Sequence, residues 1–512
     1  MVILYHNNRK VLKVVSEENI DLSFDKKSTI SAVLLKLAAA YSQSEIVWCH
    51  IDYQSYLNLD FIKQTVWQKK MMSYNPDDYN FFGKNIGFID ESPFIKINKE
   101  ISYPTWQMSS AAGAIDSSVL IAIADKIKQD SDFDYYLNSI AKVCMPLGLF
   151  CYSEPKLLFS NSLRDISPRS SNFTLFRFVK QHYRTRWSFL LVLNNIIYKF
   201  RFPFFALLYS TLFKNRNKND IDLQAVEIKS DFKTDFQSID VIIPTIGRKE
   251  HLHNILKDLS QQTILPQNII IVEQNPVSES TSELDYLTSE NWPFAIKHTF
   301  THKAGACNAR NIALSQIESE WVFFADDDIR IKNDFIKRAF ESISVYQNKA
   351  VTFSCLQKDE KAVNKIVRQW NTFGSGCSIV NSKIVKNLSF DMKYEFGFGE
   401  DSDFGMQIRN HGCDVLYFPN PEILHLKAPI GGFRTKPKLL WENDNIKPKP
   451  SPTISVYKIL HETEEQRNGY KLILFFKYYT KQSIKNPFTY FFNFKREWKQ
   501  SFYLADQLIK KA

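Results

Sequence analysis

The stretch Trp321-Val-Phe-Phe-Ala325 is followed directly by Asp326-Asp-Asp328, and this junction decides the fold class of the 512-residue chain. A short apolar run rich in aromatic and β-branched residues predicts a buried strand. Three carboxylates at its end need solvent, a partner or a metal ion. Ligands bind at the carboxyl ends of strands in α/β sheets, where carboxylate oxygens suit Mg²⁺ or Mn²⁺. The alternative is a solvated loop or an Asp helix cap before Ile329.

The residues around this junction alternate between strand and helix patterns. Apolar strands are predicted at 239–245 and 268–273, and a helix with i, i+3, i+4, i+7 apolar spacing is predicted between them at 252–259. A second helix is predicted from Gly305 to about Ile317. Strands that alternate with helices indicate βαβ units and a parallel sheet. We therefore expect an α/β fold.

A series of short motifs runs through residues 236–433. They are Ile243-Pro-Thr-Ile-Gly-Arg248, Gly305-x-x-x-Ala-Arg-Asn311, Asp326-Asp-Asp328, Gly374-Ser-Gly376, Phe398-Gly-Glu-Asp-Ser-Asp-Phe404 and His425. Each motif alone is a weak signal, but all of them occur in the order found in one family. This region resembles the inverting family-2 glycosyltransferases, which have the GT-A fold of nucleotide-diphospho-sugar transferases, a Rossmann-like mixed sheet.

The resemblance implies a metal-dependent hexosyltransferase that moves a sugar from a nucleotide-sugar donor to an acceptor hydroxyl with inversion. Asp326 and Asp328, the DXD motif, would hold Mn²⁺ or Mg²⁺. His425 would complete the metal shell, although a buried histidine with no ligand role fits the pattern Ile423-Leu-His-Leu426 equally well. The residues that the resemblance assigns to donor binding are Pro244, Thr245, Arg248, Glu273, Arg310, Asp326 and Asp327.

The pair Glu400-Asp401 supplies the carboxylates that acceptor activation needs, because a hydroxyl is a poor nucleophile until a base takes its proton. By the resemblance, Asp401 is the general base and Glu400 orients the acceptor. A second interpretation is a helix N-terminal cap, with acidic residues favoured by the helix dipole. Both interpretations can hold together.

Residues 1–165 look like a damaged copy of residues 236–433. Asp130-Ser-Asp-Phe133 repeats Asp401-Ser-Asp-Phe404, and a predicted strand from Ile46 to Asp52 resembles the acidic strand of the second copy. No Pro-Thr-x-x-Arg element precedes that strand, so half of the nucleotide-binding part is missing. We expect a degenerate, non-catalytic GT-A-like domain. The alternative is an unrelated α/β domain with chance similarity.

The net charge of +10 is concentrated in two segments. Residues 166–235 contain basic and aromatic residues, with no acidic residue between Asp165 and Asp220. The uncharged runs Trp187–Tyr198 and Phe202–Phe213 are too short to span a bilayer. They fit interfacial helices with a basic flank, and a buried helical hairpin is the alternative. We expect a helical connector that meets an anionic membrane surface.

Residues 434–512 repeat this composition, with a Pro-rich linker at 447–452 and aromatic segments at 470–479 and 488–494 set among lysines. We expect a basic amphipathic helical tail. Basic stretches also suit nucleic acid, but no recognised nucleic-acid motif is present, so we expect no such partner.

The cysteines and the N-terminus bear on location. Seven widely spaced cysteines without CxxC spacing predict neither a zinc site nor a disulfide framework. The first residues, Met1-Val-Ile-Leu-Tyr-His6, lack the pattern of a secretory signal. We expect a cytoplasmic protein, peripheral on the cytosolic membrane face, that builds surface polysaccharide or lipopolysaccharide-type glycans on a glycan or lipid-linked acceptor. The alternatives are a two-site glycan polymerase and a catalytically silent membrane scaffold.

Overall fold

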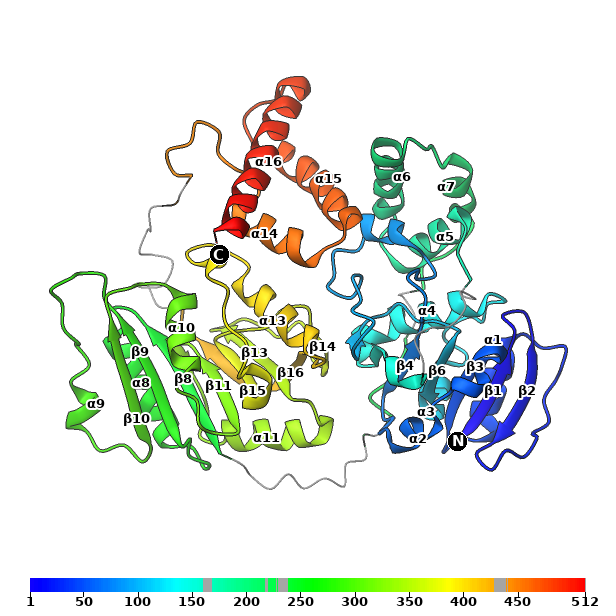
Figure 1. The fold of residues 1–512 in the computed structure, drawn as a ribbon, viewed down its shortest axis with the longest axis horizontal. Coiled ribbons are helices and arrows are strands. Elements are labelled where there is room, and N and C mark those ends of the chain that lie inside the picture. The colour runs from blue at the N-terminus through cyan, green and yellow to red at the C-terminus, as the bar shows by residue number, and fades with distance from the viewer. Residues whose placement is uncertain are drawn as a thin grey trace. The chain divides into compact units, whose positions relative to one another are not determined.

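The computed structural model describes residues 1–159, 168–216, 220–226, 228, 238–427, 439 and 441–511. The chain forms two compact units (Figure 1). Unit 1 comprises Met1–Lys229 and Glu462–Lys481, and unit 2 comprises Ser230–His461 and Gln482–Ala512. The domain boundaries expected at 165/166, 235/236 and 433/434 lie outside the described residues. The division into four parts therefore stays a prediction.

Unit 1 is built on a seven-stranded mixed sheet. The antiparallel hairpin β1–β2 forms one edge, and β1 then pairs in parallel with β3. In order across the sheet, the strands are β2 (Val11–Ser16), β1 (Val2–His6), β3 (Glu45–His50), β6 (Ala112–Asp116), β4 (Lys70–Tyr74), β7 (Phe150–Ser153) and β5 (Tyr103–Pro104). The strand predicted to reach Asp52 ends at His50, where a 3₁₀ turn, η1 (Ile51–Tyr56), begins.

The helices of unit 1 cover this sheet and extend into the basic connector. Leu175, Phe176, Phe178 and Val179 of α5 are buried in the same core as the sheet residues Leu4 and Trp48. The helices are α1 (Ile30–Ala40), α2 (Leu59–Gln64), α3 (Ser117–Ile123), α4 (Phe133–Cys144), α5 (Asn172–His182), α6 (Arg186–Lys199), α7 (Phe204–Thr211) and α15 (Glu464–Lys481), with short 3₁₀ turns η2 (Lys84–Phe88), η3 (Met145–Leu147) and η4 (Pro155–Leu157). Among the described helices, none combines the length and apolarity that a membrane crossing requires.

Unit 2 is built on a nine-stranded mixed sheet. Its strands β10, β9, β8 and β11 are parallel neighbours, as the βαβ pattern predicted. In order, the strands are β10 (Ala295–Thr301), β9 (Asn268–Gln274), β8 (Ile239–Thr245), β11 (Trp321–Ala325), β15 (Cys377–Asn381), β13 (Ala350–Gln357), β16 (Leu416–His425) and β12 (Ile329–Arg330), and β14 (Arg368–Gln369) pairs with β16. The α/β fold class expected from the sequence is confirmed.

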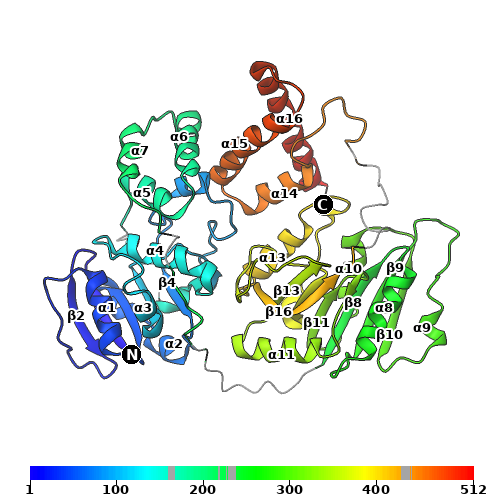
Figure 2. The ribbon, with the colours of Figure 1, turned by 180° about the vertical axis from the view of Figure 1, so that it is seen from behind.

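The helices of unit 2 include two from the basic tail. Val456 of α14 and Ala505 of α16 are fully buried in the same core as Phe404, and α14 packs on α16 (Figure 2). The helices are α8 (Lys249–Ser260), α9 (Tyr286–Ser289), α10 (Ala306–Leu314), α11 (Phe335–Tyr346), α12 (Ser382–Val385), α13 (Glu400–Asn410), α14 (Pro452–His461) and α16 (Pro487–Lys510), with one 3₁₀ turn, η5 (Met392–Tyr394).

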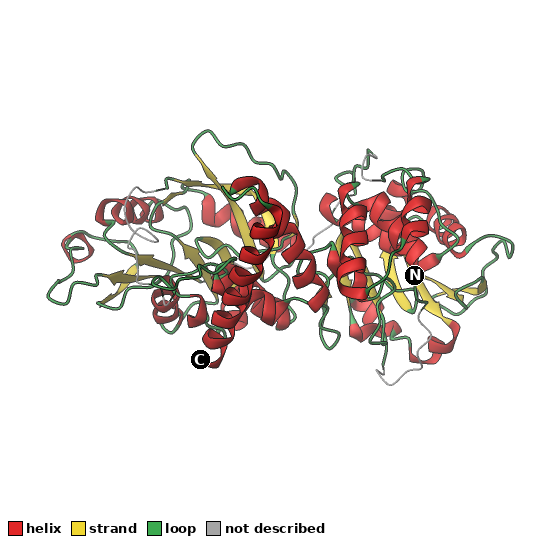
Figure 3. Ribbon diagram, turned by 90° about the horizontal axis from the view of Figure 1, so that it is seen from above, coloured by secondary structure: helices red, strands yellow, loops and turns green. Residues whose placement is uncertain are grey.

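Both units combine strands with helices, drawn in yellow and red in Figure 3. The central strands of the two sheets follow the same order. In unit 1 the order β1-β3-β6-β4-β7 has pairings that are parallel, antiparallel, antiparallel and parallel. In unit 2 the order β8-β11-β15-β13-β16 has the same series of pairings. Among the described residues of unit 1, no outer parallel strands correspond to β9 and β10, and the antiparallel strand β2 forms that edge. Unit 1 is therefore a shortened version of the fold of unit 2.

Strand register corrects the residue correspondence expected between the two copies. Asp326 N donates to Gly376 O, and the equivalent bond in unit 1 runs from His50 N to Ala111 O, so His50 and not Asp52 stands opposite Asp326. The repeated Asp-Ser-Asp-Phe motif is also out of register. Asp401 is hydrogen-bonded to Ser375, whereas the residue bonded to the equivalent Ser110 is Asp134. Asp130 lies four residues, about one helical turn, before that position.

Candidate active site

The acidic triplet lies at the carboxyl end of β11, where the sheet register brings it beside the end of β8. Ile242 pairs with Phe324, so the residues that follow β11 lie next to Thr245. Thr245 Oγ1 donates to Asp327 Oδ2 at 2.7 Å. The tertiary fold thus joins two of the motifs that were separate in the sequence.

Arg248, the residue before α8, is the counter-ion of the triplet. Its Nη1 lies 2.6 Å from Asp327 Oδ1 and 3.2 Å from Asp328 Oδ2. Burial raises the pKa of Asp327 to about 6, although the neighbouring Arg248 and the bond from Thr245 act in the opposite direction. Through these bonds to Thr245 and Arg248, Asp327 fixes the Thr245–Arg248 loop at the end of β11.

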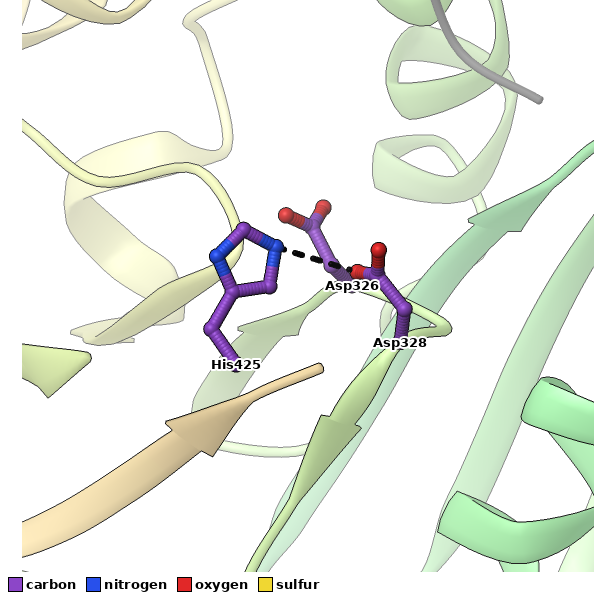
Figure 4. A group of neighbouring side chains, drawn as sticks. All are labelled: Asp326, Asp328 and His425. Atoms are coloured by element: carbon purple, nitrogen blue, oxygen red, sulfur yellow. Dashed lines mark ion pairs between the residues drawn. The ribbon is translucent and has the colours of Figure 1, made fainter. Parts of the chain in front are cut away.

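Asp326, Asp328 and His425 form a group that can hold a metal ion (Figure 4). Each offers one ligand atom, and these atoms all lie within 4.8 Å of one another. His425 arrives here because the short strand β12 pairs with β16, which sets Ile329 opposite His425. His425 Nε2 lies 3.4 Å from Asp328 Oδ1, and this hydrogen bond raises the pKa of His425. Two carboxylates and one imidazole fit Mn²⁺ or Mg²⁺, with further positions left for phosphate oxygens.

Gly376 makes room for Asp326. A Cβ at Gly376 would lie 2.1 Å from Asp326 Oδ2, so any side chain there would displace this carboxylate. The close approach follows from the antiparallel pairing of β11 with β15, in which Ala325 faces Cys377. The Gly374-Ser-Gly376 motif is thus a steric requirement of the acidic triplet.

Arg310 of α10 connects the triplet to the second acidic pair. Its Nη2 lies 3.3 Å from Asp326 Oδ1, and its charge also acts on Asp401 and Glu400. The Arg310 side chain is buried, and its Nε has no hydrogen-bond partner among the described residues. A buried N–H group without a partner can donate a hydrogen bond to an oxygen of a bound ligand.

Glu400 and Asp401 stand in the first turn of α13, where the helix dipole favours acidic residues. The helix cap expected from the sequence is wrong, because the N-cap residue is Gly399 and no side chain caps this helix. Burial and the neighbouring Asp401 raise the pKa of Glu400 to about 7. Burial also raises the pKa of Asp401, against the opposing effects of Arg310 and Ser375. Asp401 Oδ1 is buried and has no hydrogen-bond partner among the described residues. This oxygen can therefore accept a hydrogen bond from a bound hydroxyl group.

A cavity of about 320 Å³ joins these groups. Of the residues assigned to the site from the sequence, those that line it are Pro244, Thr245, Arg248, Arg310, Asp326, Asp327, Asp328, Glu400 and His425. Asp401, the residue after Glu400, is outside the lining. Glu273 is also outside it, because its carboxylate is paired with His298 at 3.0 Å and accepts the backbone N–H of Glu283.

Several residues of the site were missed in the sequence. Gln274 lines the cavity beside Glu273, and its Oε1 accepts the N–H of Gly305 at 2.6 Å. Glu395 also lines it and accepts the N–H groups of Cys307 and Asn308 at the start of α10. No local signal distinguishes these side chains from surface residues. Their roles follow from chain segments that are distant in sequence.

Helix α14 supports the segment that carries Glu400 and Asp401. Thr453 Oγ1 accepts the N–H of Phe398 at 2.9 Å, and a Cβ at Gly397 would lie 2.3 Å from Thr453 Cγ2. His461 Nε2 lies 2.6 Å from Asp403 Oδ1 in the first turn of α13. Thr453 and His461 are therefore positioning residues, in a part of the chain that looked like a separate tail.

Comparison with known proteins agrees with this site. Residues 240–398 match the family model described as "Glycosyl transferase family 2". The chain is 21% identical over 164 residues to the poly(ribitol-phosphate) beta-N-acetylglucosaminyltransferase TarS of Staphylococcus aureus, a match that covers 32% of this chain and 28% of that relative. The chain thus spans less than a third of the length of this relative.

Solved structures give similar matches. S. aureus TarS 1–349 in complex with UDP-GlcNAc has 17% sequence identity and a TM-score of 0.35, over 49% of this chain and 75% of that one. The mannosyltransferase PcManGT from Pyrobaculum calidifontis, in complex with GDP-Man and Mn²⁺, has 17% identity and a TM-score of 0.32, over 40% and 61%.

Unit 2 thus has the sheet, the motif order and the family match of a nucleotide-sugar transferase domain. The match to the family-2 glycosyltransferase model covers residues 240–398 of this unit, and the enzyme class expected from the sequence is confirmed for this domain.

Proposed function

We propose that unit 2 transfers a sugar from a nucleotide-diphospho-sugar to an acceptor hydroxyl with inversion of the anomeric centre. The observation that carries this proposal is that Asp326, Asp328, His425 and Glu400 line one cavity, and that Asp401 is the next residue after Glu400 in the first turn of α13. A set of possible metal ligands and a carboxylate pair with raised pKa values meet there, as this reaction needs.

The donor would lie along the ends of β8 and β11. Thr245 and Arg248 would border the nucleotide, and Asp326, Asp328 and His425 would hold Mn²⁺ or Mg²⁺. A bound divalent ion would offset the negative charge that the leaving nucleotide diphosphate gains. The buried Nε of Arg310 would donate to a donor oxygen at this point.

Acceptor activation is assigned to the carboxylate pair. Asp401 Oδ1 would take the proton of the acceptor hydroxyl, and Glu400, which faces the cavity, would orient that acceptor. We assign the role of general base to one residue, and no second carboxylate is assigned as a nucleophile. Direct attack by the acceptor then inverts the anomeric configuration.

We further propose that the acceptor is a glycan or a lipid-linked glycan of surface polysaccharide or lipopolysaccharide type. Support comes from the match to a relative whose name describes glycosylation of a poly(ribitol-phosphate). Unit 1 would have no part in donor binding, because it lacks counterparts of β9, β10 and the Thr245–Arg248 loop.

Association with an anionic membrane on the cytosolic face is the remaining part of the proposal. The segment from Phe200, after α6, to Leu212, after α7, presents apolar side chains to solvent, with Phe200 91% exposed, Phe205 74% and Leu212 76%. Arg201 lies among them, and acidic residues are absent from 166–219 of the sequence. An aromatic and basic protrusion of this kind suits the headgroup region of a bilayer.

A donor screen tests the catalytic proposal. The full chain is incubated with sugar nucleotides that differ in base and sugar, with Mn²⁺, Mg²⁺ or EDTA, and nucleotide diphosphate release is measured. We expect release from one donor class that requires a divalent ion and is lost in Asp328→Ala. With an acceptor present, NMR of the product should show inversion. Retained configuration would refute the mechanism, and absence of release from every donor would favour the silent scaffold.

A further inference from the structure

Unit 1 contains a cavity of about 530 Å³ whose charged lining residues are nearly all cations. It lies where the C-terminal half of α5, the residues after α7 and the segment before α4 meet. The charged side chains in its lining are Lys126, Lys128, Arg177, Lys214 and Arg216 against a single acid, Asp130.

The one carboxylate does not balance these charges. Asp130 is paired with Arg177, whose guanidinium also lies over the ring of Tyr135. No described residue forms an ion pair with Arg216, Lys128 or Lys214. The cavity therefore keeps a surplus of positive charge after its internal pairing.

Arg216 is the most informative of these cations, because its side chain is buried and only 8% exposed. Its Nη1 donates to Ser139 Oγ at 2.7 Å, and that hydroxyl is 2.7 Å from Nε2 of His182. Burial lowers the pKa of His182 to about 3, so this imidazole is neutral and supplies no counter-charge. Burial lowers the pKa of Arg216, and Asp130, which is paired with Arg177, only partly offsets this effect. A buried guanidinium with incomplete compensation is costly, and the cost is recovered when an anion arrives.

We propose that this cavity is a binding site for a phosphate-bearing ligand. Arginine and lysine side chains around a hollow are the groups that recognise phosphate oxygens in proteins. Leu212 and Phe213 line the same cavity and border the exposed apolar turn of α7, which suits a ligand with an apolar or sugar portion beyond its phosphate. A lipid-linked phosphate and a soluble phosphate ester share this chemistry.

The position of the cavity in the fold supports a ligand role. The α3–α4 segment, which supplies Lys126, Lys128 and Asp130, corresponds to the α12–α13 segment of unit 2, which supplies Glu395 and Glu400 to the donor cavity. Unit 1 has thus lost the donor side of the fold but keeps a hollow beside the loop that, in unit 2, leads to the proposed acceptor-facing carboxylate.

Pyrophosphate binding by the full chain tests the site. Isothermal titration is carried out in EDTA, which removes metal-dependent binding in unit 2. We expect saturable binding that weakens about tenfold or more in Arg216→Gln, the loss typical of one charged hydrogen bond. Because Arg216 is buried, the surface-facing double variant Lys128→Gln/Lys214→Gln is measured as well, and circular dichroism checks that both variants fold. Arg201→Gln removes a charge of unit 1 that does not line the cavity and should leave pyrophosphate binding unchanged.

Vesicles then distinguish the two sources of phosphate. Binding to phosphatidic acid vesicles in preference to phosphatidylglycerol vesicles of equal charge, lost in the double variant, would identify a membrane-borne phosphate. Pyrophosphate binding without this lipid preference would identify a soluble ligand. Pyrophosphate binding that is absent, that survives both cavity variants, or that falls equally in Arg201→Gln would overturn the proposal. None of these outcomes depends on sugar transfer, so the proposed function stands or falls separately.

Discussion

Equivalent positions at the carboxyl edges of the two sheets carry different chemistry. Where unit 2 has Asp326 beside Gly376, unit 1 has His50 beside Ala111, joined by the same backbone hydrogen bond. His50 is buried and packs edge-on against the buried His6. Side chains of unit 1 thus occupy space that unit 2 leaves as a cavity. The comparison teaches that the five central strands, which both units share, form a sheet in unit 1 as well, where side chains fill this space. The cavity of unit 2 also depends on its outer strands and on the Thr245–Arg248 loop.

One carboxylate is present in both units but in different surroundings. Asp401 has a buried oxygen without a partner beside the donor cavity. Its counterpart Asp134 accepts bonds from Ser110 N at 2.8 Å and Ser110 Oγ at 2.6 Å, and Asn138 ties the same helix to Met108. The same residue type is thus available for chemistry in unit 2 and occupied by structure in unit 1.

Neutralising Asp401 should have the largest effect on kcat, and neutralising its counterpart Asp134 should have none. We expect Asp401→Asn to lower kcat by about 10²–10⁴-fold, the usual contribution of a general base, while donor affinity stays close to that of the wild type. Asp134→Asn should leave kcat unchanged. Steady-state kinetics and donor titration measure both. A comparable loss of kcat in Asp134→Asn would show that unit 1 takes part in catalysis.

Removal of a metal ligand should have the next largest effect. Asp328→Ala should weaken Mn²⁺-dependent donor binding by at least about tenfold, a loss in the range seen when metal sites are disturbed. Asp52→Ala, at the equivalent position of unit 1, should not weaken it. Calorimetric titration of the full chain should give one donor per chain. A stoichiometry of two would revive the two-site polymerase.

In unit 2 we expect the pH to affect the reaction rate, whereas in unit 1 we expect it to affect stability. Glu400, faced by Asp401 and Arg310, has its pKa raised to about 7 by burial, so its charged form is lost as the pH falls through 7. If Glu400 must be ionised to orient the acceptor, kcat should fall about tenfold per pH unit below that value. The rate profile of Glu400→Gln should lack this step. An unchanged profile in the variant would assign the titration elsewhere.

Asp134 should instead affect stability. Burial raises its pKa to about 7, against about 3.9 in an unfolded chain, with Ser110 opposing this rise and Asp132 adding to it. The folded state then holds the proton more tightly, so the stability falls as the pH rises from about 4 to 7. Melting temperatures across this range should decline more in the wild type than in Asp134→Asn. Parallel curves would contradict the assignment.

The smallest expected effect concerns the exposed turn of unit 1. Phe200→Ser should weaken binding to anionic vesicles by about tenfold or less, since burying one aromatic side chain contributes about 1.5–3 kcal/mol when complete. Ile20→Ser changes another exposed apolar residue, 61% exposed on a different segment, and serves as the control. Sedimentation with vesicles at low and high salt measures both. Equal binding by all three proteins would show that this turn does not meet the bilayer.

Local patterns in the chain were enough to place the strands β8, β9 and β11 and the helices α8 and α10 of unit 2. The apolar runs at 239–245, 268–273 and 321–325 are strands because a β-branched and aromatic run between turn residues is most stable in a sheet interior. The motif order also named nine of the residues that line the donor cavity. These features depend on residues near one another in sequence, so the sequence reveals them.

Other features required the packed structure. The repeat Asp130-Ser-Asp-Phe133 suggested a register that is one helical turn from the observed one, because pairing between strands, and not sequence similarity, decides which residues are opposite. The tail looked like a separate amphipathic segment, yet α14 buries Val456 in unit 2 and holds the backbone of Phe398, two residues before Glu400, through Thr453. Periodicity tells which face of a helix is apolar, but only the folded chain decides what covers it.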